Sequence, residues 1–197
     1  MGKFEQQIVQ NQQEDTVRRE LRHFLSLVKK GNTECLEMLF NKQYLYKDYI
    51  WDDVLDHRFK LLDSVQIFKS LSGYIQGEKN QIFGKTSGKL GVKRKTAIEK
   101  YGYSNRNLCH YLRLCYVGAV FFSSGNYTVN LSDSEIYSAL MTIKCHPETI
   151  DLLAVEYLIA TWAQKLKDSF ENRGINYTFQ EDVADELLNR NYLKFLK

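Results

Sequence analysis

The chain is poor in proline, and this absence shapes the fold that we expect. Pro147 is the single proline among 197 residues. Proline breaks helices because it lacks a backbone N–H and its ring clashes with the preceding turn. Apolar residues, in contrast, make up 44% of the sequence and aromatic residues 13%. We therefore expect a folded, mainly α-helical protein with a substantial core, and not a disordered chain.

The sequence also lacks the features of exported and membrane proteins. Its longest apolar run, 114–122, is too short to span a bilayer. Residues 1–7 contain no apolar signal core. In a chain of this length without such a signal, we expect the four cysteines to be reduced thiols (Cys35, Cys109, Cys115 and Cys145). We therefore expect a cytoplasmic protein with no membrane partner.

No large excess of one charge is present, because the formal net charge is only +3. The distribution of charge is more informative than the total. Segment 79–100 contains seven basic residues and one acidic residue, whereas segment 148–191 contains nine acidic and four basic residues. The first segment is therefore the place where we look for an anionic partner.

Apolar residues recur at helical spacing along most of the chain. The expected helices cover residues 17–30, 33–40, 64–82, 93–101, 105–122, 133–144, 147–172 and 180–193. We expect Thr16 to cap the first of them, and Pro147 to lie in the first turn of the helix that ends near residue 172. Residues 1–14 are expected to be a polar arm or a remnant strand, and residues 15–197 a single helical domain.

A loop rich in glycine and lysine precedes the helix expected at 93–101. Glycines let a backbone approach a ligand closely, and a helix N-terminus beside lysines attracts anions. The spacing does not match a P-loop. We expect this segment to bind phosphate or nucleic acid, and the alternative is a solvated loop. The candidate residues are Lys89, Lys93, Arg94 and Lys95.

A second candidate set follows directly. Arg106, His110 and Arg113 are spaced by four and three residues, so they share one face of a helix. They follow three residues that combine cationic and aromatic side chains, Lys100, Tyr101 and Tyr103. Aromatic rings can stack on a base while arginine and lysine hold phosphates. The alternative is that the aromatic flank is buried and that the cations only face solvent.

Several segments together resemble one family, the predicted nucleotidyltransferases of the DNA polymerase β superfamily, including the RNA-repair-associated group and its phage relatives. The resemblance covers residues 15–131. It rests on the order and spacing of segments 15–25, 30–32, 36–40, 70–74, 91–94, 100–103 and 110–114. It implies the helical, bundle-like C-terminal region of a nucleotidyltransferase, with at most a small remnant of β structure.

The resemblance also implies what is missing. In that family a Gly-Ser motif and an Asp-x-Asp pair bind the triphosphate and two metal ions, and a third carboxylate lies on a later strand. Asp15 matches this third position, whereas only fourteen residues precede it and neither motif occurs there. From Asp15 alone we would give metal binding little weight, because acids before a helix favour its N-terminus anyway.

We therefore expect a degenerate or truncated family member that binds nucleotide or RNA and is not catalytic alone. Mg²⁺ is expected only if the protein is catalytic, with Asp15 as its ligand, and a second chain would then supply the missing segment. One alternative is an active enzyme with replacement carboxylates, among Glu14, Asp15, Asp48, Asp52, Asp53 and Asp56. Another is a helical protein-interaction module, acting through the aromatic region 44–59, or a decoy that competes with an active relative.

Overall fold

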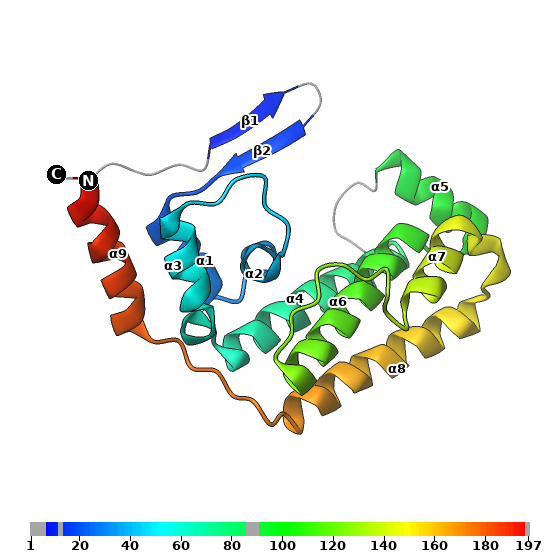
Figure 1. Ribbon diagram of the computed structural model, residues 1–197. Coiled ribbons are helices and arrows are strands. Elements are labelled where there is room, and N and C mark those ends of the chain that lie inside the picture. Colours follow the sequence, from blue (N-terminus) through cyan, green and yellow to red (C-terminus); the bar gives the residue numbers. More distant parts are fainter. Residues whose placement is uncertain (1–6, 12–13, 86–90, 196–197) are drawn as a thin grey trace. The chain divides into compact units, whose positions relative to one another are not determined.

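The computed structural model describes residues 7–11, 14–85 and 91–195 (Figure 1). This part of the chain is almost entirely helical, with nine α-helices, two short 3-10 helices and one β-hairpin. None of its helices combines the length and the apolar character needed to cross a membrane. The mainly α-helical class predicted from composition is confirmed.

The chain forms two compact units, which are described separately. The first consists of Met1–Ile67 and Tyr177–Lys197, and the second of Phe68–Asn176. Helix α4 (Ser64–Ile82) begins at the end of the first unit and contributes most of its length to the second. The expectation of a single helical domain over residues 15–197 stays a prediction.

The first unit begins with a hairpin of β1 (Gln7–Asn11) and β2 (Glu14–Arg18). The strands are antiparallel, and Thr16 lies opposite Val9. The prediction that Thr16 caps a helix beginning at residue 17 is therefore wrong. Its backbone is paired in the hairpin, and α1 begins only at Leu21.

The helices of the first unit are short. They are α1 (Leu21–Lys29), α2 (Thr33–Phe40), α3 (Tyr49–Asp56), the 3-10 helix η1 (Arg58–Leu61) and α9 (Glu181–Phe195). Between α1 and α2, Gly31 has a φ of 70°, and a Cβ there would lie 2.7 Å from the Cα atom of Ile67. Only glycine fits this close approach. The segment after η1 is joined to the chain before α9, because the Ser64 N–H donates to the carbonyl of Tyr177 over 3.0 Å.

The second unit is built around α6 (Asn105–Ser124), with α5 (Val92–Tyr101), α7 (Tyr137–Cys145) and α8 (Leu152–Glu171). Figure 1 shows α4, α6 and α8 running alongside one another. The close packing depends on Gly118 in α6, because a Cβ there would lie 2.6 Å from a methyl group of Leu166 on α8. The rings of Phe68 and Phe170 stack with centroids 3.9 Å apart and join α4 to α8.

Two predicted helix starts in this unit are wrong. Pro147 does not open the long helix but lies in a separate 3-10 turn, η2 (Pro147–Thr149). Helix α8 begins at Leu152 because the carboxylate of Asp151 accepts a hydrogen bond from the Ala154 N–H over 2.7 Å, which caps the helix. Helix α7 likewise begins at Tyr137 and not at residue 133.

Candidate functional site

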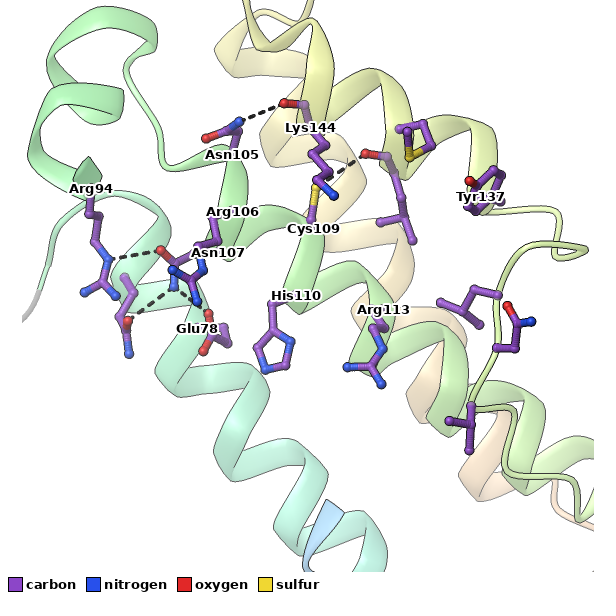
Figure 2. Close-up of a pocket in the computed structure, with 16 residues that line it drawn as sticks. Glu78, Arg94, Asn105, Arg106, Asn107, Cys109, His110, Arg113, Tyr137 and Lys144 are labelled. Carbon is purple, nitrogen blue, oxygen red and sulfur yellow. Dashed lines mark hydrogen bonds between the residues drawn. The ribbon is translucent and has the colours of Figure 1, made fainter. Parts of the chain in front are cut away.

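An open groove of about 980 Å³ lies in the second unit, between side chains of α4, α5, α6 and α7 (Figure 2). Five basic or potentially cationic side chains line it: Arg94, Arg106, His110, Arg113 and Lys144. Glu78 is the one acidic residue among the described residues of its wall. The groove is therefore a candidate site for an anion. Sixteen residues line the groove in all, and we call it the basic groove.

Helix α6 supplies the centre of the basic groove. Arg106, His110 and Arg113 line it together, as their four and three spacing predicts, and in Figure 2 His110 and Arg113 point to the same side of the helix. The opposite face of α6 is buried, with Leu108 and Leu112 fully inaccessible to solvent. The burial of that apolar stripe fixes which way the cationic face points.

A buried amide in the wall of the basic groove joins three helices. Asn107 is 6% exposed. Its side-chain N–H groups donate to a carboxylate oxygen of Glu78 over 2.7 Å and to the amide oxygen of Gln81 over 3.2 Å. Its oxygen accepts from Nε of Arg94 over 3.1 Å and from the hydroxyl of Ser104 over 2.7 Å. The amide is therefore fully hydrogen-bonded, as a buried polar group must be.

This network orients two charged groups of the wall. The bond from Asn107 holds the Arg94 guanidinium by Nε, and no hydrogen bond joins its Nη atoms to the described residues. A guanidinium held at Nε still has a fork of N–H groups that can bind two oxygens of a phosphate. The Glu78 carboxylate is bound on the opposite side of the same amide. Sequence reasoning missed Asn107. The residue belongs to no motif, and its role is visible only from its burial in the structure.

Lys144 was also missed by sequence reasoning. It lies in the last turn of α7 and reaches the groove because Asn105 of α6 donates to the carbonyls of Ile143 and Lys144 over 3.4 and 3.3 Å. Beside it, the Cys109 thiol donates to the carbonyl of Leu140 over 3.5 Å. Burial raises the pKa of this thiol to about 11, although the Lys144 charge opposes the shift. Cys109 is therefore a protonated thiol at neutral pH.

Besides Tyr103, four of the predicted phosphate-binding residues lie outside this wall. The described lining of the basic groove does not include Lys93, Lys95, Lys100 or Tyr101. Lys95 lies 3.7 Å from the carboxylate of Glu99, and Nζ of Lys100 lies 5.0 Å from the centre of the Tyr101 ring. Lys89 falls outside the residues that the structure describes.

Tyr103 does not present its ring to a ligand. Its side chain is fully buried, and its hydroxyl donates to the carbonyl of Pro147 over 2.9 Å. Burial raises the pKa of Tyr103. The hypothesis that this ring stacks on a base is therefore replaced by a structural role, in which Tyr103 joins the end of α5 to η2.

The predicted metal ligand lies in the first unit. Asp15 is part of β2, where its backbone is opposite Gln10, and its side chain lies outside the description. Across the described side chains there is no group of three or more His, Cys, Asp or Glu that would hold a metal ion.

Three of the proposed replacement carboxylates have structural partners in α3 and its flanks. Asp48 caps α3 by accepting a hydrogen bond from the Trp51 N–H over 2.9 Å. Asp52 forms an ion pair with Lys47 over 2.5 Å, and Asp53 lies 3.5 Å from Arg190 of α9. These contacts account for the three acids as parts of the fold.

The segment named as a protein-interaction surface exposes apolar side chains just before α3 and at the first residue of that helix. Leu45 is 108% exposed, Tyr46 82% and Tyr49 54%. Three exposed apolar side chains so close in sequence are the feature on which the interaction hypothesis rests.

Comparison with protein-family models, with curated proteins and with solved structures found no match to this chain.

Proposed function

We propose that the protein binds the phosphate groups of a nucleotide or of RNA in the basic groove. The observation that carries the proposal is the convergence of Arg94, Arg106, His110 and Arg113 with Lys144, from three helices, on one groove. The one described acidic side chain of the wall, Glu78, is held by a hydrogen bond from Asn107.

The composition of the wall suits a phosphate ester. Arginine binds phosphate through paired N–H groups, and such charge-assisted hydrogen bonds are stronger than neutral ones. The groove also offers amides, at Asn105 and Asn130, and apolar side chains, at Leu140 and Met141. A small-molecule site of this kind has a volume of roughly 300–1,000 Å³, and the basic groove lies at the upper end of this range. It therefore has room for a base and sugar as well as phosphate.

The wider proposal, a degenerate or truncated nucleotidyltransferase that binds without catalysing alone, rests on the sequence resemblance. In that proposal Mg²⁺ enters only with catalysis, with Asp15 as a ligand and a second chain providing the other carboxylates. The basic groove supports the proposal that the protein binds a nucleotide or RNA. Most of its cations lie within residues 15–131, the region that resembles the family, and Lys144 comes from α7.

The proposal is tested by titrating a fluorescent nucleoside triphosphate, and separately a short fluorescent RNA, at low and high salt. Binding is expected to weaken as salt rises, since each phosphate contact releases counterions. Arg94→Ala and Arg106→Ala are each expected to weaken binding about tenfold, in line with the strength of a charged hydrogen bond. Lys167→Ala, on α8, removes the same charge outside the groove and serves as the matched control.

Binding that is insensitive to salt, or equal losses in Arg106→Ala and Lys167→Ala, would contradict the proposal and favour the protein-interaction hypothesis. The catalytic part has its own assay. The protein is incubated with labelled nucleoside triphosphates, Mg²⁺ or Mn²⁺ and RNA. Robust transfer that Asp15→Ala abolishes would show that the chain is an active enzyme by itself.

A further inference from the structure

A second hollow adjoins the basic groove. This hollow, of about 450 Å³, lies on the exposed face of α4 and shares Glu78 and Gln81 with the basic groove. The shared residues make the two hollows adjacent. The second hollow therefore extends the basic groove along α4, toward the start of that helix.

The extension has an aromatic side chain beside it. Tyr74 lines the second hollow and is 46% exposed. Tyr74, Glu78 and Gln81 are spaced by four and three residues, so they lie on one face of α4. At about 1.5 Å per residue this face is about 10 Å long. In a DNA duplex each strand rises by about 3.4 Å per nucleotide, so this face is longer than one nucleotide.

This face of α4 is open at two glycines. Gly73 and Gly77 flank Tyr74, and a Cβ built at either glycine would meet no atom within 4 Å. A ligand can therefore approach the α4 backbone on both sides of the ring. Lys69, exposed and part of the same hollow, supplies a positive charge at the far end of the extension.

The two sides of the combined surface differ in chemistry. On the α6 side, Arg106, His110 and Arg113 provide donors for phosphate oxygens. On the α4 side, Tyr74 offers a ring and Glu78 an acceptor, which suits a base and its amino groups and not a phosphate. A strand lying between α4 and α6 would therefore place its phosphates toward α6 and its bases toward α4.

We infer that the ligand of the basic groove is a single-stranded nucleic acid, which continues along α4 and stacks one base on Tyr74. The inference rests on the proposed function and names its ligand class. A mononucleotide fills only the basic groove and leaves Tyr74 and Lys69 unused. The internal bases of a duplex stay stacked on one another, so none of them can lie on the ring.

The test compares four probes on the full chain: a nucleoside diphosphate, a single-stranded RNA hexamer, the DNA hexamer of the same sequence and a duplex of the RNA. Tyr74→Ala is expected to weaken hexamer binding about tenfold, as loss of one stacked base does, and to leave the nucleoside diphosphate unchanged. Tyr74→Phe keeps the ring and is expected to bind as the unmodified protein does. Tyr157→Ala, which removes a 70% exposed tyrosine from α8, is the control.

The outcomes separate this inference from the proposed function. If Arg106→Ala weakens every probe but Tyr74→Ala weakens none, the phosphate site stands and the extension along α4 is overturned. Duplex binding as tight as single-strand binding also overturns it. Loss of hexamer binding in Tyr74→Ala but not in Tyr74→Phe supports it for either sugar, and the ratio of RNA to DNA affinity shows whether the 2′-hydroxyl is recognised. No salt-sensitive binding of any probe overturns both proposals.

Discussion

Replacing Asn107 by leucine is expected to destabilise the second unit and to weaken anion binding together. The substitution keeps the volume of the side chain nearly constant, so it removes hydrogen bonds without opening a large cavity. Four bonds are lost, two of them with the charged groups of Arg94 and Glu78 and two with the neutral groups of Ser104 and Gln81.

The size of the expected loss of stability depends on how far the four hydrogen-bond partners of Asn107 are exposed to water. Hydrogen bonds to charged groups contribute about 1.5–3 kcal/mol each, and neutral ones about 0.5–1.5 kcal/mol. Arg94, Glu78 and Gln81 are half-buried, so water replaces part of what they lose, whereas Ser104 is 2% exposed and is left with less access to water. The lower ends of these ranges therefore apply, and we expect a loss of about 4 kcal/mol in the free energy of unfolding.

The assay is urea unfolding followed by tryptophan fluorescence. The chain has two tryptophans, and a Trp51→Phe background leaves Trp162, on α8, as the reporter of the second unit. Gln76→Leu is the matched control, because the exposed amide of Gln76 makes a single hydrogen bond to Asn80, over 3.2 Å. It is expected to change stability by less than about 0.5 kcal/mol.

A loss below about 1 kcal/mol in Asn107→Leu would refute the reasoning that this amide joins α4, α5 and α6. Anion binding gives a second readout in the same variant. Because Asn107 holds the Arg94 guanidinium by Nε, nucleotide affinity is expected to fall with Asn107→Leu and not with Gln76→Leu. Unchanged affinity would show that Arg94 is positioned without this bond.

Further predictions concern glycine, tyrosine and cysteine. Gly31→Ala is expected to cost about 3 kcal/mol in urea unfolding, from a positive φ and backbone overlap, whereas Gly77→Ala, with open space around it, is expected to add about 0.5–1 kcal/mol; similar values for both would contradict the close approach of Gly31 to Ile67. Tyr103→Phe is expected to cost about 1 kcal/mol, through the bond to Pro147, and an unchanged unfolding midpoint would contradict this role. A thiol reagent at neutral pH is expected to modify exposed Cys145 before Cys109. Folding raises the pKa of Cys109, so the protonated thiol contributes stability that is present below about pH 9 and is lost as pH rises toward about 11. Urea midpoints that increase between these pH values would contradict this prediction.

Helices were the part of the fold that local pattern predicted best. The helices expected at 33–40, 64–82, 93–101 and 105–122 all occur, with ends that differ by at most about two residues from expectation. The errors lie where another interaction competes for the backbone. Pairing with β1 takes the residues that would have opened α1, and the Asp151 cap moves the start of α8 beyond Pro147.

The candidate site was predicted in part. The four and three spacing of Arg106, His110 and Arg113 is enough to place them on one helix face, and Arg94 was named from the density of basic residues. The same reasoning included Tyr103, which is buried, because spacing along the chain does not show what covers a side chain. It omitted Lys144, which lines the groove from α7, and Tyr74, which lines the adjacent hollow on α4.

The sequence by itself determined that this protein is helical, which faces of its helices are apolar, and that its positive charge gathers between residues 79 and 113. Helical periodicity and charge are local properties, so they can be read along the chain. Only the tertiary structure decided which cations line one groove, that Asn107 holds one of them, and that the chain forms two compact units. These depend on contacts between residues far apart in sequence, such as Glu78 with Asn107, which no local pattern specifies.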